Sequence, residues 1–465
     1  MGVASGLFFS TNGEVDTLHS HIVPSDEQTT YLQAKWNGLA AHLIDDLAER
    51  SGYRMRSWLQ GSYKIATVIR PVSLFDEFDV DLGIYYCWDS DEQATPAAAQ
   101  LKTWAHESLV AFAETADDVK EVEQPSRERC ERIRFEKQFH IDIPAYHLNE
   151  EVDRRRLATS TKGWEPSDPK AFYVWFKDQA GNPERTQLRR VVRYLKAWAA
   201  MRFTSGQAGR PTSIQLTVLA TEAFLEVGDE VKDDEDVFCA VVANIRDRLQ
   251  QSSKVPNPVD TTENLSRQGD EELAIFLTAV DTLADTCARA KDCDDVGAAA
   301  LIWDEVFGHL FPLPDSDASI EFEQQNGRAL AVVPTLAVDV RDADGNYLAT
   351  YQDEVPRVPK NCRLRFRITN PQVIPTWATI DWVVRNAGGE ALAINDFGHS
   401  RRGARDLENE ERTAYTGRHF MDCIVRHDGN AIAATRIPVY VAPPALAKQL
   451  PAKPWYRRHV KPRRR

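Results

Sequence analysis

The sequence of 465 residues predicts an α+β fold, in which a mixed helix-and-strand unit is followed by a small all-β sandwich. Three patterns along the chain predict this fold. A long amphipathic helix and short strand-like runs come first, helical periodicity then dominates over 166–312, and strand-like alternation returns after the turn-rich stretch 312–317. At about 100–200 residues per domain, a chain of this length divides into two or three domains.

Composition and charge exclude several classes of protein. Charged residues make up 27% and hydrophobic residues 43%, which excludes collagenous and wholly disordered chains. The net charge of -14 argues against a general nucleic-acid binder. No apolar run approaches the ~20 residues of a membrane span and the N-terminal residues do not resemble a signal peptide, so we expect a cytoplasmic protein without membrane contact. Seven dispersed cysteines favour reduced thiols over a zinc site.

The first predicted element is a helix at 25–50. Ser25 and Gln28 form a capping-box pattern at its start. Apolar residues then recur at spacings of three or four on one face, at Leu32, Trp36, Leu39, Leu43 and Leu47. Runs of period two follow and predict strands at 54–60, 78–87, 131–136 and 139–148. Together these elements predict a mixed α/β domain over residues 1–165.

Helical signals dominate the second predicted domain, residues 166–312. Ser167 or Asp168 can cap a helix that has Pro169 at its first position. Further helices are predicted at 187–202, 213–226, 235–250 and 270–290. We therefore expect a helical subdomain that belongs to the same large unit as the mixed domain.

The last third of the chain is predicted to be an all-β sandwich at 318–445. Its alternating runs are separated by turn signals at 344–345, 388–389 and 428–429. A tail at 446–465 follows, with seven lysines and arginines and no acidic residue from Lys453 onward. We expect this tail to be disordered or, because Trp455 and Tyr456 interleave with arginines, to bind nucleic acid.

The clearest chemical pattern consists of Gly61, Ser62 and three aspartates. Gly61-Ser62 forms a turn after one predicted strand, and Asp79 and Asp81 lie two residues apart on the next, so both carboxylates point to one face. Asp142 is a third carboxylate in an otherwise apolar strand. Three converging carboxylates suit two Mg²⁺ or Mn²⁺ ions, while Gly61 and Ser62 suit a phosphate. An isolated Asp-x-Asp is usually a solvated strand face, but this combination favours a site.

These motifs resemble the nucleotidyltransferases of polymerase-β type, and specifically the cGAS/DncV-like nucleotidyltransferases (CD-NTases), over about residues 25–310. Further motifs of the resemblance are GWEPSDPKAF, LRRVVRYLKAW, PTSIQLTVLATEAF and VPNPVDTTENL. The resemblance implies a polymerase-β-like core with a helical subdomain. It also implies that the catalytic residues and metal ligands are Asp79, Asp81 and Asp142, and that Gly61 and Ser62 bind the nucleotide.

A row of cations lies on the helix at 187–202. Arg189, Arg193 and Lys196 are spaced four and three residues apart, beside an apolar stripe. Such a row can hold a triphosphate or simply face solvent. Ser213 stands at a predicted helix start, where N–H groups favour anions but where a serine is often only a cap. The resemblance implies that Lys196 and Ser213 contact nucleotide phosphates.

Other candidate residues give weaker evidence of a functional site. His140 and His147 flank Asp142 without the spacing of a zinc site, and we expect His140 to be structural. The β region resembles the AGS-C domain, a predicted sensor module fused to CD-NTases, at Trp382, Asn386 and the run YTGRH at 415–419. We expect Trp382 to be a core residue. A set of basic residues could form an anion site: Arg401, Arg402, Arg405 and His419.

The resemblance implies a metal-dependent synthase that joins nucleoside triphosphates into a cyclic oligonucleotide second messenger for antiphage (CBASS) signalling. The substrates would be ATP, with GTP and UTP as further candidates, and a separate effector would receive the product. A nucleic-acid or nucleotide ligand of the β domain or basic tail is a further expected partner. Two alternatives stay open: transfer of a nucleotide onto RNA or protein, and a catalytically silent nucleotide sensor.

Overall fold

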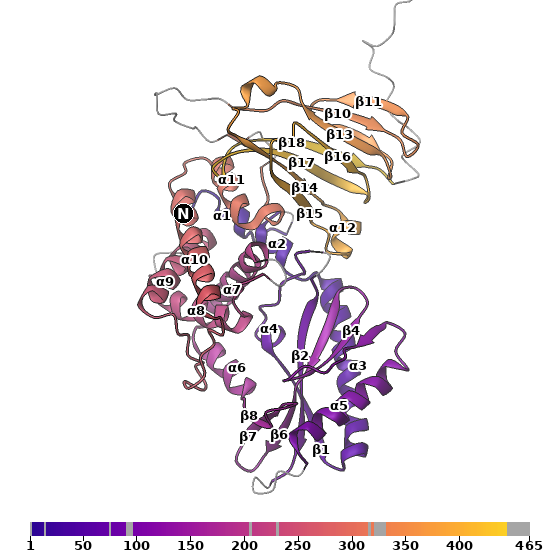
Figure 1. Ribbon diagram of the computed structural model, residues 1–465, viewed down its shortest axis with the longest axis vertical. Helices are drawn as coiled ribbons and strands as arrows, with labels where there is room; N and C mark the ends of the chain where they lie inside the picture. The colour runs from indigo at the N-terminus through magenta and orange to yellow at the C-terminus, as the bar shows by residue number, and fades with distance from the viewer. Residues whose placement is uncertain are drawn as a thin grey trace, which may run out of the picture. The chain divides into compact units, whose positions relative to one another are not determined.

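The structure is a computed structural model that describes residues 2–13, 15–73, 76–89, 96–203, 207–228, 232–314, 318–319 and 332–443 (Figure 1). The chain forms two compact units, Met1–Ala288 and Arg289–Arg465. The basic tail predicted at 446–465 lies outside the described residues. No helix in the described ranges has the length and apolar character needed to cross a membrane.

The first unit is built around an eight-stranded mixed sheet. Its strand order is β3-β4-β5-β2-β6-β7-β8, and β1 pairs with β2. The central strand β2 is antiparallel to β1 and parallel to both β5 and β6. The strands are β1 Arg54–Gln60, β2 Phe78–Cys87, β3 Val119–Val122, β4 Glu131–Phe135, β5 Phe139–Ile143, β6 Ala145–Asn149, β7 Arg154–Ala158 and β8 Trp164–Pro166.

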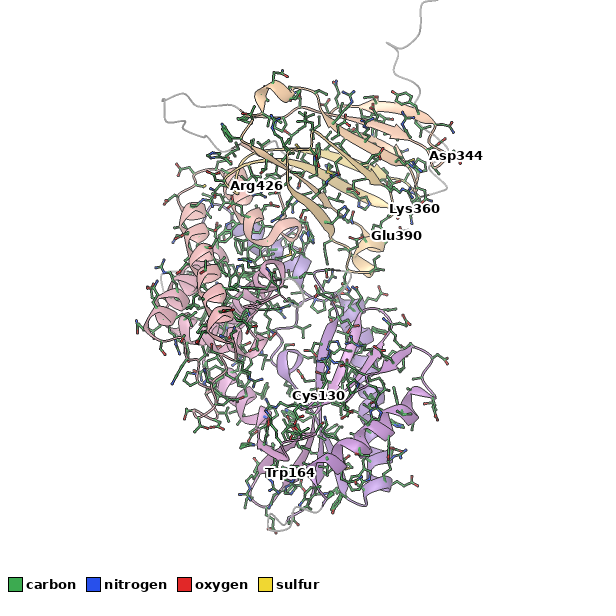
Figure 2. All side chains as sticks on the ribbon, in the orientation of Figure 1. Cys130, Trp164, Asp344, Lys360, Glu390 and Arg426 are labelled. Atoms are coloured by element: carbon green, nitrogen blue, oxygen red, sulfur yellow. The ribbon has the colours of Figure 1, made fainter. Side chains whose placement is uncertain are left out.

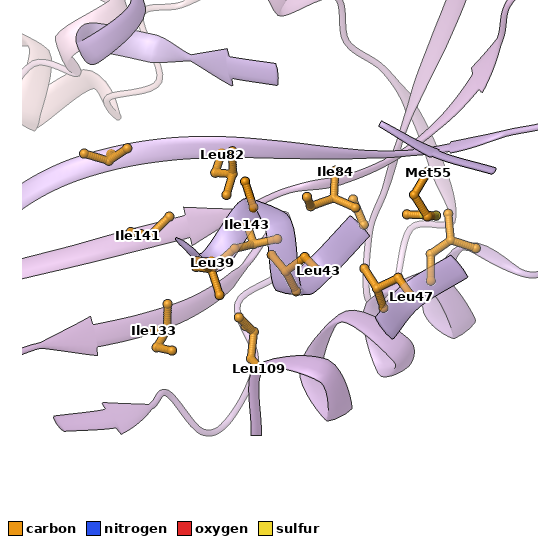
Figure 3. Packing of buried hydrophobic residues seen from close by; sticks show 14 of the residues in the cluster. Leu39, Leu43, Leu47, Met55, Leu82, Ile84, Leu109, Ile133, Ile141 and Ile143 are labelled. Atoms are coloured by element: carbon orange, nitrogen blue, oxygen red, sulfur yellow. The ribbon is translucent and has the colours of Figure 1, made fainter. Parts of the chain in front are cut away.

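Two helices, α3 (Asp26–Ser51) and α5 (Ala98–Ala113), pack on one face of this sheet. The predicted capping box closes the start of α3, because Ser25 accepts from the Gln28 N–H while the Gln28 side chain accepts from the Ser25 N–H. Figure 3 shows the apolar face of α3 against the strands. The residues labelled there are Leu39, Leu43, Leu47, Met55, Leu82, Ile84, Leu109, Ile133, Ile141 and Ile143. This core fixes one face of β2 and β5, so the other face is left for the site.

Helices make up the rest of the first unit. Asp168 caps α6, with Pro169 at its first position as predicted. Helices α7, α8 and α9 pack against one another. The helices are α1 Ser5–Phe8, α2 Leu18–Ile22, α4 Gly61–Lys64, α6 Pro169–Asp178, α7 Asn182–Arg202, α8 Ser213–Leu225, α9 Asp234–Gln251 and α10 Asp270–Lys291. The last of these helices runs across the division between the units.

The second unit is a sandwich of a four-stranded sheet, β11-β10-β13-β16, and a six-stranded sheet, β12-β18-β17-β14-β15 with β9 paired to β18. Its strands are β9 Ala318–Ser319, β10 Leu336–Arg341, β11 Tyr347–Tyr351, β12 Val355–Val358, β13 Arg363–Ile368, β14 Thr379–Arg385, β15 Gly398–Ala404, β16 Glu408–Arg412, β17 Gly417–His427 and β18 Asn430–Val441. Its helical segments are α11 Val296–Phe307, η1 Gly308–Leu310, η2 Pro371–Val373 and α12 Gly389–Ala393. Trp382 is buried in the core between the sheets, as expected.

The predicted fold class, an α+β unit followed by a β sandwich, is confirmed. The predicted strands at 54–60 and 78–87 have the observed bounds, whereas the strand predicted at 139–148 divides into β5 and β6 at Pro144. Helix α11 packs on β18 and belongs to the second compact unit. The predicted domain bounds at 1–165, 166–312 and 318–445 stay predictions.

Candidate active site

The three aspartates lie on two neighbouring parallel strands. In the register of β2 and β5, Asp81 is opposite Asp142 and Asp79 is opposite His140. Val80 and Ile141 on the same strands are fully buried in the core behind them. The alternation of β2 and β5 therefore directs the carboxylates away from the core, as the sequence predicted.

The Gly61-Ser62 turn faces Asp81 directly. Gly61 follows β1, whose last residue Gln60 is paired with Asp81, and it has a left-handed φ of 60°. A Cβ atom at this position would lie 1.9 Å from Oδ2 of Asp81, so any side chain here would displace that carboxylate. Glycine is thus required both by the backbone conformation and by the approach of the carboxylate.

Two of the carboxylates have cationic or N–H partners. Arg132 on β4 forms a two-point ion pair with Asp142, with Nη2 2.7 Å from Oδ2. Nε2 of His140 lies 3.0 Å from Oδ1 of Asp79, and its Nδ1 lies 2.9 Å from Oε2 of Glu77. Asp81 has no ion-pair or hydrogen-bond partner among the side chains that the structure describes.

The crowding shifts the pKa values of the two β2 aspartates in opposite directions. Burial, with the charges of Asp79 and Asp142, raises the pKa of Asp81 well above its usual value. Burial opposes ionisation of Asp79 too, but the hydrogen bond and charge of His140 hold its pKa below the usual value. A carboxylate crowded by two others is a group that a bound cation would relieve.

The donor set fits a divalent metal ion. One ligand atom each from Asp79, His140 and Asp142 lie within 4.8 Å of one another, and Asp81 stands opposite Asp142. Carboxylate oxygens are the ligands that Mg²⁺ and Mn²⁺ prefer. His140, expected from the sequence to be structural, contacts Asp79 through its ring and belongs to this cluster.

The carboxylates open into a cavity of about 1080 Å³, large enough for more than one drug-sized ligand. Gly61, Ser62, Lys196 and Ser213 line the same cavity, so it brings together the predicted metal ligands and the predicted nucleotide-binding residues. Aromatic walls come from Tyr146, Phe172 and Tyr173, and arginines from Arg127, Arg129, Arg154, Arg155 and Arg267. Cys130, labelled in Figure 2, is another lining residue.

Comparisons with known proteins agree on both units. The family described as "Cyclic GMP-AMP synthase DncV-like, nucleotidyltransferase domain" matches residues 55–146, and the "Adenylyl/Guanylyl and SMODS C-terminal sensor domain" matches 320–442. A protein of Escherichia albertii named cyclic GMP-AMP synthase is 29% identical over 97% of this chain and 99% of its own length. A c-di-GMP synthase of Roseivirga ehrenbergii is 23% identical over 65% of this chain and 86% of its own.

The solved structure of the Vibrio cholerae di-nucleotide cyclase DncV with GTP and 5MTHFGLU2 has the same fold. Its TM-score is 0.57 at 19% identity, and the match covers 67% of this chain and 96% of that one. The chain is a CD-NTase with a C-terminal AGS-C domain. It is therefore a nucleotidyltransferase.

In this CD-NTase the cations of α7 hold the segment after the Gly-Ser turn. Nε of Arg189 donates to the Ile65 carbonyl at 3.0 Å, and Nε of Arg193 donates to the Val68 carbonyl at 3.2 Å. These two arginines, read from sequence as candidates for holding triphosphate, thus contact backbone. They position the chain that follows Ser62.

Lys196 both contacts the segment after the Gly-Ser turn and lines the cavity. Its Nζ donates to the carbonyl of Thr67 at 3.1 Å and to its hydroxyl at 3.2 Å, while the side chain lines the cavity. Burial lowers the pKa of Lys196 to about 8, although the charges of Asp79 and Asp81 oppose that shift. Ser213 begins α8 and lines the cavity, and the helix cap is its neighbour Thr212. The serine hydroxyl is therefore not consumed by capping.

Sequence reasoning missed Arg132 and the contact made by His140, although one signal could have found them. The tight turn between β4 and β5 pairs Phe135 with Phe139, and counting outward pairs Arg134 with His140 and Arg132 with Asp142. Hairpin register therefore places a cation opposite the third carboxylate.

In the AGS-C domain the predicted anion site is not assembled as one cluster. Arg401 pairs with Asp406 at 2.7 Å, Nε of Arg402 donates to the Ser400 hydroxyl, and Arg405 donates to the carbonyl of residue 374. His419 instead lines a separate cavity together with Asn386 and Tyr415. These three residues are among the positions on which the resemblance to AGS-C rests.

Proposed function

We propose that this CD-NTase joins nucleoside triphosphates into a cyclic oligonucleotide in the large cavity of its first unit. One observation carries the proposal: Asp81 faces Asp142 across adjacent strands, next to Asp79 and the Gly61-Ser62 turn, in a cavity of about 1080 Å³. We expect ATP as a substrate, with GTP and UTP as further candidates.

The relatives support a cyclic product. The Escherichia albertii protein, which matches nearly the full chain, is named a cyclic GMP-AMP synthase. A structure of Vibrio cholerae DncV contains the linear intermediate 5′ pppA(3′,5′)pG. A cavity that holds a linear dinucleotide in that protein is a precedent for two successive transfers in one site.

Asp79, Asp81 and Asp142 would hold the divalent ions, Mg²⁺ or Mn²⁺. When bound, such ions supply positive charge that offsets the crowded carboxylates and the triphosphate. Asp81 has a raised pKa and no ion-pair or hydrogen-bond partner among the described side chains, so it gains most from the added charge. Arg132 keeps Asp142 oriented, and His140 does the same for Asp79.

The other residues of the cavity bind and position nucleotides. Gly61 lines the cavity next to Asp81, and the hydroxyls of Ser62 and Ser213 can donate to phosphate oxygens. Lys196 adds a positive charge between the carboxylates and α8. The aromatic walls at Tyr146, Phe172 and Tyr173 offer flat surfaces to bases.

The reaction that this arrangement suits is a pair of displacements. A ribose hydroxyl of one nucleotide forms a bond to the α-phosphorus of another, the bond to the β-phosphate oxygen breaks, and pyrophosphate leaves. A second displacement between the two linked nucleotides closes the ring. The residues accelerate both steps chiefly by holding the reacting atoms in line and by balancing charge.

We further propose that the product acts as a second messenger in antiphage (CBASS) signalling in the cytoplasm. A separate effector would bind the cyclic product, and the AGS-C domain would report a ligand to the enzyme. The description of the matching family as a sensor domain is the support for this role.

A product assay tests the proposal. Purified protein is incubated with the four labelled ribonucleoside triphosphates and Mg²⁺ or Mn²⁺, treated with phosphatase, and analysed by mass spectrometry. We expect a phosphatase-resistant cyclic product that is lost in Asp79→Ala/Asp81→Ala. Asp117→Ala, which changes an exposed aspartate of the same unit, is the matched control and keeps the product.

Two outcomes would contradict the proposal. A resistant product that persists in the double variant would show that the aspartates are not the catalytic groups. Labelled RNA or protein in place of a cyclic product would support the alternative acceptor.

A further inference from the structure

The AGS-C unit contains a cavity of about 100 Å³ between its two sheets. Apolar walls come from both sheets, through Leu364 and Phe366 on β13 and Met421 and Val439 on β17 and β18. The polar lining residues are Asn386, Asp396, His399, Glu411, Arg412, Thr413, Tyr415 and His419. None of these polar residues has a part in the proposed nucleotidyl transfer.

His419 presents an unused acceptor. The residue is 8% exposed, and its Nε2 lies 2.9 Å from the carbonyl oxygen of Tyr415, so Nε2 carries the proton. Burial lowers the pKa of His419, which keeps the ring neutral and leaves Nδ1 as an acceptor. Nδ1 is buried and has no hydrogen-bond partner in the described part of the chain. A buried acceptor without a donor is costly, so a ligand that donates here is favoured.

Asp396 is a second acceptor group. Its carboxylate accepts the Tyr415 hydroxyl at 2.7 Å, the Asn386 amide at 3.1 Å and the Gly398 N–H at 3.2 Å. No arginine or lysine of the described chain pairs with it. Three neutral donors thus orient a carboxylate whose charge remains uncompensated and which retains one further lone-pair site.

Glu411 supplies a third acceptor. Its Oε1 accepts from His399 at 3.2 Å and from the Asn409 amide at 2.9 Å, whereas Oε2 has no partner among the described residues. The His399 side chain is 59% exposed, which places this side of the cavity next to solvent. The lining therefore offers two carboxylates, Asp396 and Glu411, and its one arginine among the described residues, Arg412, is exposed.

Glycines hold the polar part of the lining in place. A Cβ on Gly398 would lie 1.9 Å from the Val384 carbonyl oxygen, and a Cβ on Gly417 would lie 2.5 Å from that of Ala387. Both glycines have positive φ, 131° and 137°. These close approaches hold the segments that follow Asp396 and Tyr415 against the end of β14, so the acceptors stand on a rigid frame.

The size and walls restrict the ligand. A cavity of about 150 Å³ can hold benzene, so this one suits a single small, flat group whose remainder extends to the solvent side. The rings of Phe366, Tyr415 and Phe420 line it, and aromatic walls favour flat or cationic groups. Carboxylates disfavour a phosphate at the same place.

We propose that this cavity binds a ligand through a small, flat head group with several N–H donors, as in a guanidinium or an amino-substituted heterocycle. His419 Nδ1, Asp396 and Glu411 accept those N–H groups, and the aromatic rings cover the flat faces. The site is independent of the aspartate cluster of the first unit.

Binding of four probes to the full-length protein tests the proposal, by saturation-transfer NMR titration. Methylguanidine and cytosine carry the N–H groups, whereas hexamethylguanidinium and N4,N4-dimethylcytosine keep the charge or the ring but lack them. We expect millimolar or tighter binding of at least one of the first two and at least tenfold weaker binding of its methylated counterpart. Which of the two binds distinguishes a guanidinium ligand from a heterocyclic one.

Variants locate the binding site. Asp396→Asn and His419→Phe should each weaken binding at least tenfold, and Tyr440→Phe, an exposed position of β18 outside the cavity, should not. Asp79→Ala/Asp81→Ala should bind the probe as the wild type does. No binding of either probe, unchanged binding in Asp396→Asn, or loss of binding in the Asp79/Asp81 variant would each overturn the proposal. If a melting curve shows that His419→Phe does not fold, binding of the probe to Asp396→Asn alone tests the site.

Discussion

Each unit contains a cluster of three aspartates, but the two clusters differ in how many of their carboxylates are paired with arginine. In the second unit Asp304, Asp381 and Asp422 are at most 2% exposed at their side chains, and each forms ion pairs with arginines. The pairs, all between 2.5 and 2.7 Å, are Arg385–Asp304, Arg385–Asp422, Arg426–Asp304, Arg426–Asp381 and Arg436–Asp422. Arg426 is labelled in Figure 2. Three aspartates therefore meet three arginines.

In the first unit three aspartates meet one arginine and one histidine. Arg132 pairs with Asp142 and His140 with Asp79, while Asp81 has neither kind of partner in the described chain. The pKa values follow this difference. Burial with two neighbouring carboxylates raises the pKa of Asp81, whereas Arg385 and Arg426 outweigh burial and lower the pKa of Asp304 to about 2.

The difference separates a structural charge network from a binding site. The network in the second unit is complete, and it fastens α11 to β14 and β17, so no ligand is needed. The aspartates of the first unit are short of positive charge and line a large cavity. Incomplete charge pairing inside a cavity is the feature that supports the proposed active site.

The largest expected effect is on catalysis. Asp142→Asn removes a carboxylate charge from the cluster and should lower kcat/KM by about 1,000-fold or more. The melting temperature should change little, because the amide can still accept from Arg132. Product formation by chromatography and a melting curve check both values. An activity within tenfold of the wild type would contradict the assignment of Asp142.

The matching change in the second unit should act on stability. Asp304→Asn leaves Arg385 and Arg426 buried with less opposing charge and should cost about 3–5 kcal/mol of unfolding free energy in that unit. Calorimetry, or denaturant unfolding followed by circular dichroism, measures this change in unfolding free energy. The comparison between the units fails if Asp304→Asn costs less than Asp142→Asn.

The two clusters should respond to pH with opposite signs. The pKa of Asp304 is lowered to about 2, so its stabilisation is present above pH 3.8 and is lost, by about 2 kcal/mol, as pH falls towards 2. The pKa of Asp81 is raised, so metal-free protein loses stability as pH rises above 3.8. Calorimetric melts of Asp81→Asn and wild type across this range should therefore diverge as pH rises. If the melting temperatures of the two proteins change with pH in parallel, the raised pKa of Asp81 is contradicted.

A smaller effect is expected at α7. Arg189→Ala removes the bond to the Ile65 carbonyl that holds the segment after Ser62, and kcat/KM should fall about 5- to 10-fold. Arg246→Ala, which changes a partly exposed arginine of α9 that pairs with Asp247, is the control and should leave the rate unaltered. If Arg189 binds triphosphate directly instead, the loss should appear in KM and grow with the number of phosphates on the substrate.

The sequence predicted the parts of the fold that local patterns determine. The Ser25–Gln28 capping box, β1, β2 and the cap at Asp168 follow from spacing and residue type. The place of α11 does not, because it depends on ion pairs between Asp304 and strands about 80 and 120 residues further along the chain. Contacts so distant in sequence leave no local pattern.

The site shows the same division. Asp79, Asp81, Asp142 and the Gly61-Ser62 turn were found because a strand repeats every two residues. The roles of Arg189 and Arg193 were not, since their carbonyl partners lie about 125 residues away in sequence. A cation on a helix face has the same sequence signature whether it binds a phosphate or a backbone carbonyl.

The most direct test of the central claim is a calorimetric titration of Mn²⁺ into wild type, Asp81→Asn and Asp381→Asn. We expect wild type to bind Mn²⁺, Asp81→Asn to lose this binding, and Asp381→Asn, if it folds, to keep it. Equal Mn²⁺ affinity in wild type and Asp81→Asn would contradict the claim that the partly paired aspartates of the first unit form the metal-dependent active site.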